Sequence, residues 1–338
     1  MDHNNFTGGL PNIVGSPIER IIDLSYNSFS GSIPHSWKNL KELIVLNLWS
    51  NRLSGEVQDH LFEWKQLQIM NLSQNVEVVI LRANQFEGNI PPQLFNLSNL
   101  FHLDLAHNKL SGSLPHCVYN LTQMDTDDHV HEWYDIIVDL FTKGQYYVYH
   151  VSPKRRTVDL SANTLSGEVP LELFRLVQVQ TLNLSHNNLT GIIPKMIGDM
   201  RNTESLDLSN NKFFGEIPQS MALLNFLEVL NLSCNNFDGK IPIGTQIQTF
   251  DASSFIGNLK LCGAPLNNCT TEEEDPKNAT PSTENEDDES IREPLYLGMG
   301  VGFAVGFWGI CGSLFLIRKW RHAYFRFIYG VGDKLYVT

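Results

Sequence analysis

The residues of this 338-residue chain that could do chemistry are cysteines, aromatic side chains and glycosylatable asparagines. Cys262 and Cys269 have six residues between them, and we expect a disulfide because the surrounding sequons indicate a secretory context. Cys234 suits a free thiol as well as a bond, and Cys117 has no obvious partner. The nine N-x-[ST] sequons are at Asn5, Asn71, Asn96, Asn120, Asn183, Asn188, Asn231, Asn268 and Asn278. Several arise only because a repeated strand reads L-N-L-S, but together they fit an exposed, secreted surface.

Aromatic residues are the candidates for ligand binding, because they anchor interfaces as well as fill cores. Five of the six candidates lie in residues 123–154, which are acidic at the start and aromatic throughout. The candidates are Trp49, Trp133, Tyr134, Tyr146, Tyr147 and Tyr149. An aromatic patch that only covers an interrupted core is an equally good interpretation, and both stay open here.

The sequence contains no nucleophile with its base, no paired acid and base, and no metal-ligand spacing. His129 and His131 near Asp127 and Asp128 lack a regular spacing, so we expect solvated loop residues there. The net charge of −13 is unlike that of a nucleic-acid-binding protein. We therefore expect no enzyme, no cofactor, no bound metal and no nucleic-acid partner.

A 24-residue repeat must position these residues. The asparagine of L-x-x-L-x-L-x-x-N recurs at this interval in three runs: Asn27, Asn51 and Asn75; Asn84 and Asn108; Asn163, Asn187, Asn211 and Asn235. In residues 179–194, VQTLNLSHNNLTGIIP, two leucines alternate with a polar residue as in a short strand with one buried face. Asn187 ends the strand, and its amide can satisfy the backbone groups of the turn. Stacked units share a core that one unit cannot bury alone.

The repeats therefore predict a leucine-rich-repeat solenoid with a parallel sheet along one face. They occupy residues 1–122 and, in four regular units, residues 155–250, with the insert 123–154 between them. Pro194 should keep the second extended segment of the unit from acting as a central strand.

The first block of repeats has an irregularity. Asn75 and Asn84 are only nine residues apart, so we interpret a 15-residue deletion between Asn75 and Val76. Two parallel neighbours need a crossover of about a dozen residues, so the segments around Leu72 and Leu81 cannot both be regular consecutive strands. We expect one of the two to give up its place. The chain also begins without a signal peptide or capping unit, which we interpret as truncation.

The C-terminal part changes character in four steps. Residues 251–271 form a cap, and residues 272–294, with ten acidic and two basic side chains up to 293, form a disordered spacer. Residues 295–317 carry no charge and would make roughly 35 Å of helix, enough to cross a bilayer. Basic residues dominate the tail 318–338, which places it in the cytoplasm. The resulting topology is single-pass type I.

Two short motifs accompany this span. Gly298, Gly302 and Gly306 line one helix face and could admit a partner helix, although glycine is generally common in membrane helices. Tyr324 and Phe327 match the Y-x-x-Φ pattern of a sorting signal, or they simply anchor the helix end.

The sequence resembles a known family in several motifs taken together. The segment L-[ST]-G-x-[IV]-P, as in LSGSLP (110–115), LSGEVP (165–170) and LTGIIP (189–194), is similar to the plant-specific class of leucine-rich repeats. The order of repeats, insert, four repeats, LCGAPLNNC cap, acidic spacer, glycine-rich span and short basic tail resembles plant receptor-like proteins without a kinase domain. The stretch from Phe141 to Gly191 is similar to the receptors for fungal ethylene-inducing xylanase.

The resemblance implies a plasma-membrane receptor that recognises a microbial elicitor in plant defence and signals through a partner receptor kinase. A developmental peptide receptor of the same architecture and a non-functional truncated paralogue are the alternatives. An inhibitor of fungal polygalacturonase is disfavoured, because such proteins end after the cap.

Overall fold

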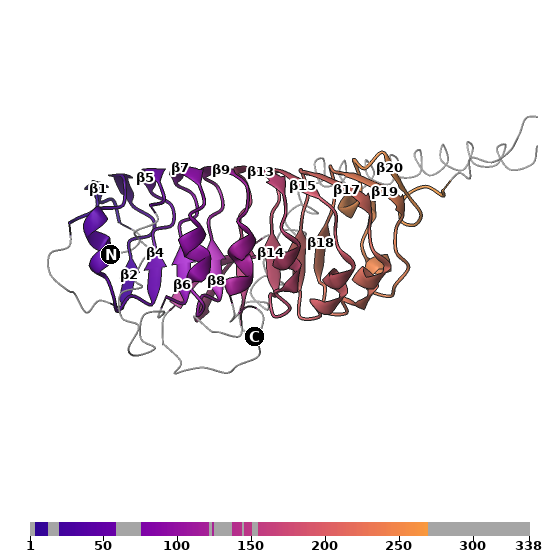
Figure 1. The fold of residues 1–338 in the computed structure, drawn as a ribbon, viewed down its shortest axis with the longest axis horizontal. Coiled ribbons are helices and arrows are strands. Elements are labelled where there is room, and N and C mark those ends of the chain that lie inside the picture. The colour runs from indigo at the N-terminus through magenta and orange to yellow at the C-terminus, as the bar shows by residue number, and fades with distance from the viewer. Residues whose placement is uncertain are drawn as a thin grey trace, which may run out of the picture. The chain divides into compact units, whose positions relative to one another are not determined.

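The computed structural model describes residues 4–12, 20–58, 76–121, 124, 137–143, 145–150 and 155–269. The first strand of each repeat joins an eight-stranded parallel sheet in which every strand spans three residues. Its strands are β2 (Ile21–Asp23), β4 (Val45–Asn47), β6 (Val78–Ile80), β8 (His102–Asp104), β12 (Thr157–Asp159), β14 (Thr181–Asn183), β16 (Ser205–Asp207) and β18 (Val229–Asn231). They follow one another in chain order along the stack (Figure 1). The leucine-rich-repeat solenoid predicted from the period is confirmed.

A second parallel sheet of ten strands runs along another side of the stack, where the sequence predicted none. Its strands are β1 (Thr7–Gly8), β3 (Ser28–Gly31), β5 (Arg52–Glu56), β7 (Gln85–Asn89), β9 (Lys109–Gly112), β13 (Thr164–Glu168), β15 (Asn188–Gly191), β17 (Lys212–Glu216), β19 (Asn236–Lys240) and β20 (Lys260–Cys262). Pro194 was expected to keep the second extended segment from continuing as a central strand, and the strand of this repeat agrees with that expectation. β15 ends at Gly191, before the proline, so the missing N–H lies outside the ladder.

Short 3-10 helices complete the repeats. They are η1 (His35–Asn39), η3 (Pro92–Asn96), η4 (His116–Asn120), η6 (Leu171–Arg175), η7 (Lys195–Asp199) and η8 (Gln219–Leu223). Each follows a proline, such as Pro194 in extended conformation before η7. The cap adds η9 (Ile247–Thr249) and η10 (Ala252–Ser254).

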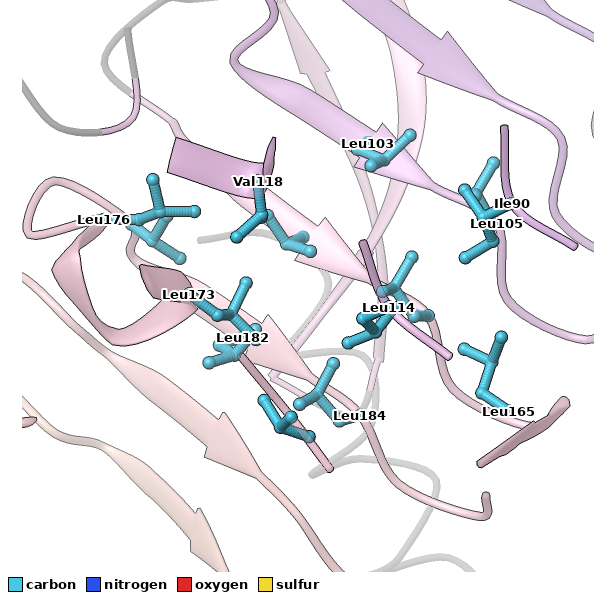
Figure 2. Packing of buried hydrophobic residues seen from close by; sticks show 14 of the residues in the cluster. Ile90, Leu103, Leu105, Leu114, Val118, Leu165, Leu173, Leu176, Leu182 and Leu184 are labelled. Atoms are coloured by element: carbon cyan, nitrogen blue, oxygen red, sulfur yellow. The ribbon is translucent and has the colours of Figure 1, made fainter. Parts of the chain in front are cut away.

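Leucine and other apolar side chains fill the interior between the two sheets and the 3-10 helices. Figure 2 shows Leu182 and Leu184 of one repeat beside Leu173 and Val118 of earlier ones. Leu184, Leu189 and Leu206 have no exposed surface at all. The predicted sharing of one continuous core by stacked units is confirmed.

The expected asparagine ladder joins each repeat to the one before it. The Asn187 side chain donates to the carbonyl oxygens of Leu184 and Ser185 in its own repeat and of Leu160 in the preceding repeat, at 3.0–3.2 Å. Its Oδ1 accepts from the Leu165 N–H at 3.0 Å. The same pattern holds at Asn51, Asn84, Asn108, Asn163, Asn211 and Asn235, and Asn258 repeats it in the cap. Asn27 donates to Leu24 and Ser25 of its own repeat and accepts from the Phe6 N–H.

In the repeats, the residue before each ladder asparagine is left-handed without being glycine, whereas Gly257 takes this place in the cap. Cys234 has φ 53°, and Tyr26, Ser50, Ala83, His107, Ala162, His186 and Asn210 lie between 51° and 55°. This conformation is uncommon for non-glycine residues. Here it brings the following asparagine back over the turn.

At the irregular repeat the ladder passes directly from Asn51 to Asn84. Leu53 N–H donates to Asn84 Oδ1 at 3.0 Å, and β4 pairs in register with β6. The segment around Leu81 therefore takes the rung after β4. The competing segment around Leu72, together with Asn75, lies outside the described residues.

The stack continues across the insert without a break. β8 pairs with β12 so that His102 lies opposite Thr157, although about 55 residues separate them. Within the insert, β10 (Ile137–Thr142) and β11 (Gln145–His150) form an antiparallel hairpin, which we call the island hairpin.

The predicted spacer, membrane span and tail, residues 272–338, lie outside the described residues. Within the part of the chain that the structure does describe, no helix is both long and apolar enough to cross a bilayer.

Candidate ligand-binding face

The eight-stranded sheet has a face opposite the leucine core, which we call the front face. Alternation along the strand places residues such as Val79 and Leu81 in the core and Val78 and Ile80 on the front face. A face of this kind is repeated rung after rung, so neighbouring repeats bring equivalent positions side by side. It is the surface on which widely spaced residues can act together.

The front face is apolar over its first rungs. A cluster separate from the main core consists of Ile44, Val45, Trp49, Val78, Ile80 and Phe101, each at most 4% exposed. The rings of Trp49 and Tyr26 lie 5.0 Å apart. Farther along, the equivalent positions carry polar side chains such as His102, Thr181 and Ser205, so the face is polar from β8 to β16, whereas β18 begins with Val229.

Aspartate and asparagine alternate along the middle row of the front face. Asn47 donates to Asp23 at 2.9 Å, and Asn183 donates to Asp159 at 3.4 Å, each from the neighbouring repeat. Alternation avoids two carboxylates on adjacent parallel strands, which would repel. The alternation is interrupted by Ile80 on β6 and by the pair Asp104 and Asp159, which lie directly opposite each other on β8 and β12.

Arg82 compensates for this pair of carboxylates. Its Nη1 donates to Asp159 at 2.9 Å and to Asp104 at 3.2 Å, and all three side chains are at most 3% exposed. One guanidinium between two buried carboxylates leaves an excess negative charge. Burial and the Asp159 carboxylate raise the pKa of Asp104 to about 7, although Arg82 opposes them. Asp104 thus holds a proton more readily than an exposed aspartate would.

Two neighbours of this cluster are also tuned by burial. His102 at the start of β8 is 2% exposed, and burial together with the Arg82 charge lowers its pKa to about 3, so it is neutral. Burial raises the pKa of Glu77 to about 7. Burial therefore favours the uncharged forms of both His102 and Glu77.

The island hairpin touches the front face of the last repeats. Lys143, in the turn of the hairpin with φ 53°, binds Glu204 Oε2 and Glu228 Oε2 at 2.7 Å each. These glutamates come immediately before β16 and β18. The insert thus joins the stack after β9 and reaches rungs that come several repeats later.

Those of the predicted ligand-binding residues that the structure describes lie in two different segments of the chain. Trp49 is 3% exposed within the apolar cluster, so its ring does not offer a free surface. Tyr146, Tyr147 and Tyr149 belong to β11 of the island hairpin. Trp133 and Tyr134 lie outside the described residues.

The predicted covalent sites are cysteines and glycosylatable asparagines. A disulfide joins Cys262 to Cys269 in the cap, whereas Cys117 and Cys234 are free thiols. Asn5, Asn188 and Asn268 are exposed. Asn183 and Asn231 lie in front-face strands, where each Oδ1 accepts from the serine hydroxyl of its own sequon, and Asn96 accepts from Asn120. Asn71, Asn278, the span glycines Gly298, Gly302 and Gly306, and Tyr324 with Phe327 lie outside the described residues.

Sequence reasoning missed the Arg82 cluster and the Lys143 contact. A signal for the first existed, because Asp104 and Asp159 occupy the same position of their repeats. Recognising it required the assumption that β12 follows β8 directly despite the insert. For the Lys143 contact, the sequence shows two glutamates one repeat apart, but it does not show that the hairpin extends toward them.

Comparisons with known proteins agree with this architecture. The leucine rich repeat family models match residues 154–213, and also 20–40, 99–121 and 226–246. Receptor-like protein EIX2 of Solanum lycopersicum is 38% identical over an alignment that includes 100% of this chain and 39% of that protein. The chain is a leucine-rich-repeat protein similar to plant receptor-like proteins.

Other receptor-like proteins show the same relationship. Receptor-like protein 33 of Arabidopsis thaliana is 42% identical over 90% of this chain and 34% of its own length. The chain thus spans about two fifths or less of the curated receptor-like proteins compared here.

Solved structures agree on the fold. The ectodomain of the plant membrane receptor kinase GASSHO1/SCHENGEN3 from Arabidopsis thaliana, in complex with CASPARIAN STRIP INTEGRITY FACTOR 2, aligns with a TM-score of 0.51 at 25% identity. That alignment covers 80% of this chain and 33% of the receptor. A TDR receptor structure aligns with a TM-score of 0.54 at 24% identity, over 71% of this chain and 35% of its own.

Proposed function

We propose that this chain acts at the plasma membrane as a receptor-like protein. Its repeats recognise an extracellular ligand, a microbial elicitor in plant defence, and a partner receptor kinase carries the signal onward. The observation that carries this proposal is the identity of 38% to a receptor-like protein, which extends over all of this chain.

The organisation of the front face supports recognition rather than catalysis. The face combines a buried apolar section around Trp49, the Arg82 cluster, and a polar section against which the island hairpin lies. These elements supply a firm support for a large partner. In the described residues, no group of three or more histidine, cysteine or acidic side chains is placed to hold a metal ion.

The test is a gain of response in leaf cells that express the tagged chain. Protein fractions from fungal culture filtrates should trigger an oxidative burst that control cells lack, and a receptor kinase should co-purify with the chain. The matched control replaces residues 123–154 by a glycine–serine segment of equal length and keeps every repeat. If no fraction distinguishes cells with the chain from cells without it, the defence function is wrong.

A developmental peptide receptor is the second candidate. It is favoured by the similarity in fold to the receptor kinase ectodomain solved in complex with CASPARIAN STRIP INTEGRITY FACTOR 2. The same cells challenged with the plant's own secreted peptides, instead of fungal fractions, distinguish the two. A response to plant peptides alone would replace the defence function with a developmental one.

A further inference from the structure

The contact between Lys143 and the last repeats depends on the period of the solenoid. Glu204 and Glu228 occupy equivalent positions 24 residues apart, and the Glu228 N–H donates to the Glu204 carbonyl at 2.7 Å. The two carboxylates therefore project from adjacent rungs, where like charges repel. A single ammonium within 2.7 Å of both removes that repulsion.

The ammonium is well placed to remain there. The Lys143 side chain is 21% exposed, compared with 28% for Glu204 and 61% for Glu228. A partly desolvated ion pair with two acceptors is stronger than an isolated surface pair. The contact also joins residues 85 positions apart in the chain, so it defines the position of the whole hairpin tip.

Burial on the front face is consistent with a covering element along the strand starts. Thr157, Thr181 and Ser205, the first residues of β12, β14 and β16, are only 4–5% exposed. Val229, the first residue of β18 and the last rung reached by Lys143, is less buried. At the other end of the same strands His186 is exposed. The first residues of β4, β6 and β8 are buried as well, so the covered row extends past the rung where the insert ends and reaches the rung of Glu204.

We propose that the island hairpin is a strap across the starts of β12, β14 and β16, closed by a latch in which Lys143 binds Glu204 and Glu228. Opening the latch frees the hairpin and bares the polar section of the front face around Thr181 and Ser205. The latch consists only of charged side chains near the surface, so added salt weakens it. It sets how much of this face a partner can reach, whatever the ligand.

The first test uses trypsin, which cleaves after lysine. In the full chain, Lys143 should resist cleavage while it is latched. The double variant Glu204→Gln with Glu228→Gln keeps Lys143 but removes both charges, and cleavage after Lys143 should become about tenfold faster. The matched control is Glu168→Gln with Glu216→Gln, which removes two exposed glutamates of the ten-stranded sheet, on β13 and β17.

The second test does not require cleavage at the latch. Lys143→Met should raise hydrogen exchange about tenfold in the strands of the island hairpin, because an isolated two-stranded hairpin is only marginally stable in water. Lys143→Arg should restore protection, since guanidinium also pairs with carboxylates. Lys212→Met, at an exposed lysine of β17, is the control for the charge change.

The two tests together decide the proposal. It is supported if cleavage after Lys143 and exchange in the hairpin rise in the latch variants while the controls match the parent protein. Unchanged cleavage or unchanged exchange would overturn it. An equal rise at every lysine or in every repeat would overturn it as well, because that result means general destabilisation instead of strap release.

Discussion

Arg82 Nη1 lies 2.9 Å from the Asp159 carboxylate, although 77 residues separate the two in the chain. This contact crosses the insertion point, since Arg82 follows β6 and Asp159 ends β12. Together with Asp104 it forms a buried charge cluster where the Asp/Asn alternation of the front face is interrupted. The two blocks of repeats are therefore held together by charge as well as by strand pairing.

The first prediction is a pH dependence of stability that comes from Asp104. Its pKa is raised from 3.8 to about 7, first by burial and then by Asp159, so the folded state binds a proton that the unfolded state releases. This group favours folding below about pH 4, and its contribution is lost as the pH rises to 7. Raising the pH from 5 to 8 should cost the parent protein about 2 kcal/mol more than Asp104→Asn, measured by chemical denaturation.

The control for this prediction is Asp199→Asn, an exposed aspartate at the end of η7. Its pH profile should follow that of the parent. The comparison between variants is needed because His102, with a pKa lowered to about 3, contributes in the opposite direction below pH 6.5. If the stability of Asp104→Asn and of the parent protein changed with pH in parallel, the raised pKa of Asp104 would be contradicted.

The second prediction concerns the asparagine ladder. Asn187→Ala removes three donated hydrogen bonds and one accepted bond, which leaves backbone groups of two repeats unsatisfied. The free energy of unfolding should fall by about 2–4 kcal/mol. Asn202→Ala, which loses only an exposed bond to Gln178, should change it by less than about 0.5 kcal/mol. Equal effects of the two substitutions would refute the ladder as a source of stability.

The third prediction compares the two blocks of repeats. β14 and β16 lie within four uninterrupted units that end in a disulfide-closed cap, whereas β2 and β4 precede the irregular repeat. In a solenoid, stability depends on contacts with neighbouring repeats. Amides of β2 and β4 should exchange faster than those of β14 and β16, as measured by hydrogen exchange with mass spectrometry. Uniform protection along the stack would count against a weaker first block.

The fourth prediction is a type I topology, based on the uncharged stretch 295–317 and the basic residues after it. When intact cells are treated with protease, an epitope tag at Thr338 should survive and a tag within residues 272–294 should be removed. Loss of the C-terminal tag on intact cells would exclude this topology.

The fifth prediction concerns the glycine face formed by Gly298, Gly302 and Gly306. Replacing all three by leucine should weaken co-purification with a receptor kinase, because helix association in a membrane depends on close approach of small residues. Replacing Gly309 alone by leucine serves as the control. Undiminished association of the triple variant would show that these glycines have no role in pairing.

Features repeated in every unit could be predicted from the sequence, because each copy supports the same interpretation. The strand around Leu182 and the position of Asn187 are local properties of the period, and the structure confirms them. The second sheet was not predicted, because the short strand β15 before Pro194 was not assigned from the sequence. Arg82 and Lys143 could not be assigned, since their partners come from distant repeats whose neighbours are defined only by the folded stack.

The uninterrupted pairing of β8 with β12 means that the insert between them can be replaced. Because His102 lies opposite Thr157 as in any two consecutive repeats, the stack does not depend on what the chain does between them. That seam can accept a different segment, provided that it is long enough for the parallel crossover and that its two ends meet one rung apart. Exchange of the insert at this one position would give the same scaffold a new specificity without remodelling a single repeat, and it offers a defined graft site for engineering.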